Sequence, residues 1–164
     1  MLAYSTMIKP VDQLYEAHHG MVFRTAYRIT GNAADAEDVL QTVFLRMVRR
    51  DSASSGIDNP ESYLRRSAVN AALDVVRARR QSDTLAPERM AASGSCTELA
   101  ELRDTLRREL SKLPPRTAEM FAMRFFEGFT NPEIAKLLGI SQVVVAVTLH
   151  RTRRKLQKEM GGSQ

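Results

Sequence analysis

Apolar residues recur every three or four positions along most of this chain, which is the spacing of one face of an α-helix. The clearest stripe comprises Ala36, Val39, Leu40, Val43, Phe44, Met47 and Val48. Similar patterns run through residues 12–30 and 60–80. No segment alternates convincingly with the period of two that marks a half-buried strand. The pattern therefore predicts an all-α fold.

The helical pattern is lost over residues 81–97, where Pro87, Gly94 and several serines replace it. Such a composition is typical of a flexible linker. A second helical pattern follows, broken by Pro114 and Pro115, and its apolar positions are Leu99, Leu102, Leu106, Leu110, Leu113, Ala118, Phe121, Ala122 and Phe125. The sequence thus predicts two small helical domains, at residues 11–80 and 99–160, with a linker at 81–98.

Residues 130–156 carry the signals of two helices joined by a tight turn. Thr130 or Asn131 can cap the first helix, and Gly139 is placed to take the left-handed conformation that ends it. Ser141 is a ready N-cap for the second helix. A short helix, a turn with glycine and a longer basic helix predict a helix-turn-helix, whose second helix enters the DNA major groove. The alternative is an ordinary helical hairpin with a solvated charged end.

The second of these helices has two different sides. Val145, Leu149, Thr152 and Leu156 share the side that we expect to be buried. Counting 100° per residue, the outward side that would meet DNA bases or phosphates comprises Gln142, Val143, Ala146, Val147, His150, Arg151 and Arg154.

The charge distribution supports a polyanionic partner for the second domain. The net charge is +5, and the whole surplus lies from Leu99 onward, where 12 basic residues accompany 7 acidic ones. Such an electrostatic footprint is expected of a DNA-binding unit. Cys96 is the only cysteine, which excludes an intramolecular disulfide. Because no apolar run approaches a membrane span and the N-terminus resembles no secretory signal, we expect a cytoplasmic protein without membrane insertion.

Three stretches resemble bacterial RNA polymerase sigma factors of the compact extracytoplasmic-function (ECF) group. They are ADAEDVLQTVFLRM, YLRRSAVNAALDVVRARR and ELSKLPPRTAEMFAMRFFEGFTNPEIAKLLGIS, in the family's order and spacing. The resemblance implies that residues 11–80 bind the polymerase clamp and open the −10 element, and that residues 99–160 read the −35 element. It also implies core RNA polymerase and promoter DNA as partners, often an anti-sigma protein, and no catalytic residue, cofactor or metal.

Individual positions follow from the same resemblance. The clamp-binding motif maps onto Asp35, Glu37, Asp38 and Gln41, and an acidic helix face does suit a basic protein partner. The family's promoter-melting region maps onto residues 51–59 and the following helix, where Tyr63 replaces the family's usual tryptophan. The polar and phosphate-binding positions of that helix are Arg65, Arg66, Asn70, Asp74, Arg77, Arg79 and Arg80.

One helix departs from the family. Ala146, Val147 and Thr148 stand where Lys, Ser and Arg are common, so we expect weak readout of the −35 element. Two other functions stay open. A stand-alone helix-turn-helix regulator would not need the acidic helix. A helical phosphohydrolase could hold Mg²⁺ at the acidic cluster from Asp35 to Asp38, but no second carboxylate motif accompanies this cluster.

Overall fold

The computed structural model describes residues 10–51, 57–85 and 98–162, which form seven α-helices and no strand. The helices are α1 (Pro10–Thr30), α2 (Ala33–Asp51), α3 (Pro60–Leu85), α4 (Glu98–Lys112), α5 (Pro115–Phe125), α6 (Asn131–Leu138) and α7 (Gln142–Gly161). The predicted all-α fold is confirmed for these residues.

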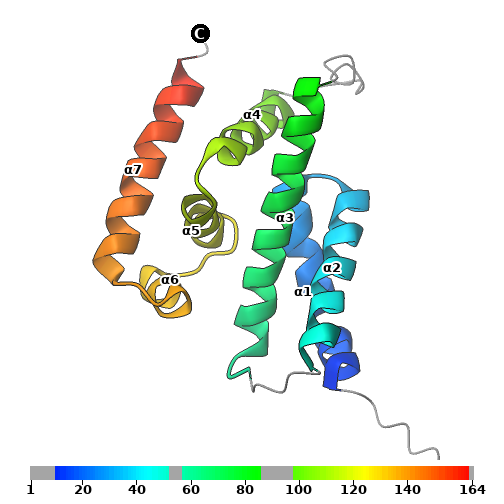
Figure 1. The fold of residues 1–164 in the computed structure, drawn as a ribbon. Helices are drawn as coiled ribbons and strands as arrows, with labels where there is room; N and C mark the ends of the chain where they lie inside the picture. The colour runs from blue at the N-terminus through cyan, green and yellow to red at the C-terminus, as the bar shows by residue number, and fades with distance from the viewer. Residues whose placement is uncertain (1–9, 52–56, 86–97, 163–164) are drawn as a thin grey trace, which may run out of the picture.

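The first three helices form a bundle, with α1, α2 and α3 in mutual contact (Figure 1). Their apolar stripes meet in its centre, where Val22, Val43, Leu64 and Leu73 are almost fully buried. The link from α1 to α2 is short because Gly31 adopts a positive φ of 68°. A left-handed residue of this kind ends a helix without a steric penalty only when it is glycine.

The remaining helices form a second unit, in which α7 packs against α4, α5 and α6 (Figure 1). Its core contains Leu110, Met123, Ile134, Val145 and Leu149, all at most 6% exposed. The unit is therefore held together by contacts of α7 with α4 and α5, which lie earlier in the chain, as well as with the adjacent α6.

Helix α3 is the part of the first unit that packs against the second, because it contacts α4 and α5 as well as α1 and α2 (Figure 1). The helix continues to Leu85, so the first residues of the predicted linker at 81–98 are helical. The last residue of that linker, Glu98, begins α4. Residues 86–97 of the linker lie outside the described residues, as do residues 52–56 of the loop before α3.

Four residues predicted to lie in apolar cores are exposed instead. They are Val48, Leu99, Leu102 and Phe125, with exposed fractions between 49% and 54%. In α4 the buried residues are Leu110 and Ser111, near its C-terminal end, so its first turns extend beyond the neighbouring helices. Apolar spacing identifies the side of a helix that is buried, but it does not say how far along the helix a neighbour reaches.

Candidate nucleic-acid and polymerase interfaces

The two helices of the predicted helix-turn-helix are fixed by local hydrogen bonds. The Thr130 Oγ1 accepts from the Glu133 amide at 3.3 Å, and Glu133 Oε2 accepts from the Thr130 amide at 2.9 Å, which is a capping box. Gly139 ends α6 with a φ of 65°, and Ser141 Oγ accepts from the Val144 amide at 3.2 Å. The chain bends by 112° between α6 and α7, within the range of helix-turn-helix motifs.

The two sides of α7 are as predicted. Val145, Leu149, Thr152 and Leu156 are buried against the rest of the second unit. The outward residues are all exposed: Gln142, Val143, Ala146, Val147, His150, Arg151 and Arg154. Val143 is 71% exposed and Val147 41%, so the first turns of this surface are largely apolar and the following turns are basic.

A groove of about 780 Å³ lies where the start of α3 meets the turn between α5 and α6. Tyr63, Arg65 and Arg66 line it from α3, and Phe129 and Lys136 line it from the second unit. Three of the predicted promoter-melting residues therefore lie around one concave surface.

Tyr63 has a neighbour that sequence reasoning missed. The Arg50 Nη1 of α2 donates to the Tyr63 hydroxyl at 3.1 Å, and the Arg50 guanidinium lies 5.0 Å from the centre of the tyrosine ring. Cation–π and hydrogen-bond contacts together hold the ring in one orientation. No signal in the sequence links the two residues, because a loop separates their helices.

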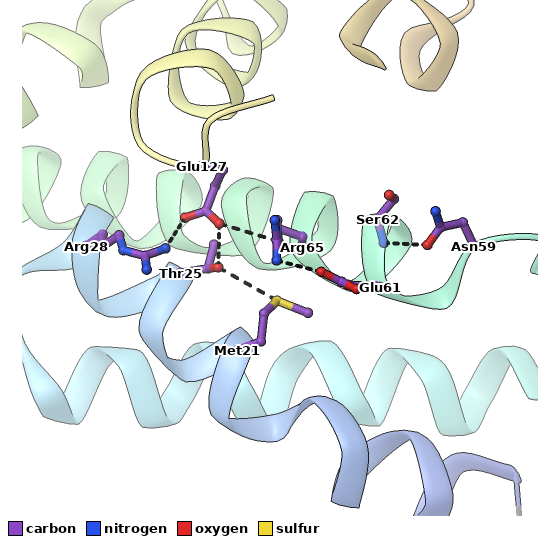
Figure 2. A network of polar contacts seen from close by, with 8 residues as sticks. All are labelled: Met21, Thr25, Arg28, Asn59, Glu61, Ser62, Arg65 and Glu127. Carbon is purple, nitrogen blue, oxygen red and sulfur yellow. Dashed lines mark hydrogen bonds and ion pairs between the residues drawn. The ribbon is translucent and has the colours of Figure 1, made fainter. Parts of the chain in front are cut away.

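The arginines at the start of α3 contact carboxylates of the second unit. Arg66 Nε donates to Glu119 Oε1 at 2.6 Å, and Asn70 Nδ2 donates to the same oxygen at 2.9 Å. Arg65 donates to Glu61 Oε1 at 2.7 Å within α3, and its Nε lies 3.7 Å from Glu127 Oε2 (Figure 2). Side chains predicted to bind DNA are thus paired with acidic groups in this conformation.

The C-terminal half of α3 carries the remaining predicted positions. Arg77 pairs with Asp74 at 3.3 Å, and Arg79 pairs with Asp35 of α2 at 2.7 Å, while Arg80 is exposed. Asp35 and Arg79, predicted to bind two different partners, therefore bind each other. The Asp35 side chain is only 13% exposed, which sets it apart from the other predicted clamp-binding residues.

Those other residues lie on an open surface of α2. Glu37, Asp38 and Gln41 are exposed, and the same surface continues to Leu45 and Val48, which are 57% and 49% exposed. We call Asp38, Gln41, Leu45 and Val48 the α2 stripe, because their spacing of three and four residues places them on one side of the helix. Sequence reasoning did not single out Leu45, and a large exposed leucine beside polar groups is the signal that marks it.

Clusters of metal-ligating side chains and long apolar helices are two further features that bear on function in the described part of the chain. No group of three His, Cys, Asp or Glu side chains there could hold a metal ion. No single helix there is long and apolar enough to cross a membrane, and only α6 and α7 taken together across their bend reach the required length and composition.

Comparisons with known proteins agree with these two units. Sigma-70 region 2 matches residues 14–82, and Sigma-70, region 4 matches residues 103–156. The ECF RNA polymerase sigma factor SigE of Mycolicibacterium smegmatis is 33% identical, over 89% of this chain and 60% of that protein. The RNA polymerase sigma-E factor of Streptomyces avermitilis is 30% identical, over 91% of this chain and 84% of that protein.

A solved structure has the same fold. The sigma factor RpoE of Bartonella quintana, in complex with the anti-sigma factor NepR, aligns with a TM-score of 0.54 over 93% of this chain and 97% of that one. The identity is 15%, so this likeness concerns the fold alone. The chain spans less than two thirds of the M. smegmatis protein.

Proposed function

We propose that this chain binds core RNA polymerase and directs it to promoter DNA, because it belongs to the ECF group of bacterial RNA polymerase sigma factors. The observation that carries this proposal is the pair of units in family order, a three-helix bundle followed by a capped helix-turn-helix. Either unit by itself would be compatible with a protein that does not bind polymerase. The two units together suit a factor that contacts promoter DNA at two separate elements.

The α2 stripe is the proposed docking surface for polymerase. It joins a carboxylate, an amide and two aliphatic side chains on one exposed side of a helix. Exposed aliphatic groups gain little from a phosphate backbone, and a carboxylate is repelled by it. The same mixture suits a protein surface with basic groups around an apolar centre. Glu37 lies beside the stripe and adds a second exposed carboxylate.

The groove between the start of α3 and the turn that joins α5 to α6 is the proposed site for the melted strand. A single strand is held by stacking its bases on aromatic rings and by pairing its phosphates with cations. Tyr63 supplies the ring, and Arg50, which contacts that ring, supplies a cation beside it. Arg65 and Arg66 supply further cations, provided that their present acidic partners are displaced.

The outward side of α7 is the proposed −35 reader. Val143, Ala146 and Val147 can contact thymine methyl groups but cannot hydrogen-bond base edges. His150, Arg151 and Arg154 follow on the same exposed side and can bind phosphates or guanine. We therefore propose tolerant −35 readout, with specificity shifted toward the −10 element.

The chain acts by bringing polymerase to the promoter, and its own residues form no covalent bond with a substrate. It positions polymerase and stabilises the open strand, and the chemistry of RNA synthesis stays with the polymerase. The proposed site of action is the cytoplasm, where polymerase and chromosome are found. Since a neighbour of the same fold binds an anti-sigma factor, we propose that a partner of this kind restrains the present chain as well.

Transcription from genomic DNA tests the proposal. The chain, mixed with core polymerase and fragmented host DNA, is expected to produce RNA that begins at defined positions which core polymerase alone ignores. Sequencing the RNA 5′ ends measures this directly. A stand-alone regulator would instead bind duplex DNA without polymerase and start no RNA. A phosphohydrolase would consume a nucleotide with Mg²⁺ in the absence of both.

Replacing Tyr63 with alanine is expected to impair promoter opening more than promoter binding. The ring can stack only on a base that has already left the duplex, and one such stack contributes ~1–3 kcal/mol. Transcription from a duplex promoter should fall accordingly, while transcription from a pre-melted bubble should recover most of the loss. Tyr63→Phe, which keeps the ring but loses the hydroxyl bonded to Arg50, separates stacking from that bond. Equal loss on both templates would place Tyr63 in the structural core instead.

A further inference from the structure

We propose that the first two turns of α7 recognise the C5-methyl group of pyrimidines, so that methylation of cytosine in the −35 element strengthens the binding of this chain. The inference rests on the proposed function of α7 and names the chemical group that this helix reads. Thymine carries a C5-methyl group on its major-groove edge, and 5-methylcytosine carries it at the same ring position. Uracil and cytosine lack it. A side chain that contacts only the methyl group therefore accepts either methylated base.

The outward side of α7 begins with exposed apolar side chains. Val143 is 71% exposed and Val147 41%, and Ala146 is exposed as well. In a helix-turn-helix, the N-terminal residues of the second helix are the ones that contact base edges. Because α7 begins at Gln142, these three residues lie in its first two turns. They hold the positions that face the bases when the helix enters the major groove.

Valine suits a methyl group and no other feature of a base edge. Its side chain has no donor or acceptor, and the thymine methyl is the one apolar group that an unmodified base pair presents in the major groove. Branching at Cβ leaves valine one strongly preferred rotamer in a helix, so little side-chain freedom is lost on packing. Burying one apolar carbon changes affinity about fourfold, or ~0.8 kcal/mol. This is less than a bidentate hydrogen bond contributes, which agrees with tolerant −35 readout.

The spacing of the two valines sets how many base pairs they can read. Val143 and Val147 lie four residues apart on one side of the helix, so their Cβ atoms are separated by about 5–6 Å. Successive base pairs are separated by about 3.4 Å along the duplex. The two side chains therefore span two adjacent base pairs, and the methyl effect is confined to one or two neighbouring positions.

The rest of the outward side favours DNA over a protein as the partner of this apolar turn. His150, Arg151 and Arg154 continue the same side and are exposed, and Glu159 near the far end is the only acidic residue of α7. The major groove offers methyl groups on the base edges and phosphates along its borders. An apolar turn followed by cations complements both groups.

Duplexes that differ by a single methyl group test the inference, with the full chain bound to core polymerase. Mapped RNA 5′ ends define the promoters, and every base pair of a −35 element contains one pyrimidine. At each position, cytosine is compared with 5-methylcytosine opposite guanine, and uracil with thymine opposite adenine. In both comparisons the methyl group should raise affinity about fourfold at one or two adjacent positions. Equal affinities within both pairs at every position would overturn the inference.

The double variant Val143→Ala with Val147→Ala shows whether the valines are responsible. Alanine is the best helix former and both positions are exposed, so the fold should be kept. The methyl effect should fall to less than about twofold. The control Val144→Ala makes the same change at a side chain that is 49% exposed but lies about 100° around the helix from Val143. This control should keep the effect.

An effect of methylation on DNA shape gives a different pattern. A methyl group that acts through the shape or stiffness of the duplex would act equally on the natural chain and on both variants. A methyl effect of full size in the double variant would therefore overturn recognition by the valines. Salt gives a second readout, because an apolar contact releases no counterions. The ratio of methylated to unmethylated affinity should stay constant while the overall affinity falls with rising salt.

The outcomes separate this inference from the proposed function. Defined RNA starts without a methyl effect would overturn methyl recognition and leave the sigma-factor function standing. If no template gives a defined start, the proposed function fails, and the chain alone is then tested on duplex libraries with a short random segment. One library contains thymidine and the other deoxyuridine. Selection of a base pattern from the thymidine library alone would support methyl recognition, and equal selection from both would overturn it.

Discussion

Exchanging Asp38 for arginine together with Gln41 for alanine is expected to abolish most of the affinity for core RNA polymerase. Removing one partner of a close interface charge pair typically costs ~2–5 kcal/mol, and a reversed charge adds repulsion. The bundle should stay folded, because both side chains are exposed while Val39 and Val43 beneath them are 1% exposed. Polymerase pull-down and thermal melting measure the two quantities separately.

A matched control is available on α1. Glu16 and Gln13 are an exposed acid and amide three residues apart, like Asp38 and Gln41, so Glu16→Arg with Gln13→Ala makes the same chemical change elsewhere on the bundle. Polymerase binding should survive that change. If the α2 double variant is captured by polymerase as well as the control, the α2 stripe is not the docking surface.

In the natural chain, transcription is expected to depend only weakly on the base at each position of the −35 element. Introducing a basic side chain into α7 is expected to make this dependence stronger. Ala146 is exposed, whereas Thr148 is half-buried, so Ala146→Lys should have the larger effect and Thr148→Arg the smaller one. A side chain that donates to a base edge discriminates by ~1–3 kcal/mol per base pair, and the natural apolar turn supplies no such donor. Transcription from every single substitution of the −35 element measures the change.

The control for this experiment is Gln157→Lys, which adds the same charge near the far end of α7. It should raise affinity evenly without changing the preferred bases, since phosphate contacts carry no sequence information. Penalties of ~1–3 kcal/mol at several G or A positions in the natural chain would contradict weak readout. A flat profile that Ala146→Lys leaves flat would instead favour the competing view, in which Val143 and Val147 form a patch for a regulatory protein.

Local chemistry in the sequence was sufficient to predict the helix-turn-helix. The capping box of Thr130 and Glu133, the left-handed Gly139 and the Ser141 cap each act within a few residues. The buried side of α7 also follows from spacing alone, because one apolar stripe must face whatever neighbour is present. Such features need no knowledge of the rest of the fold.

The tertiary structure alone decided which groups meet across the chain. Arg66 and Glu119 are 53 residues apart, and no spacing rule predicts that a DNA-binding arginine pairs with a glutamate of the other unit. The pairing of Asp35 with Arg79 and of Arg50 with Tyr63 is of the same kind. Exposure of Leu99 and Leu102 likewise depends on where the neighbouring helices end. The physical reason is that helical periodicity orients each side chain about its own axis, whereas the partner it meets depends on how whole helices pack.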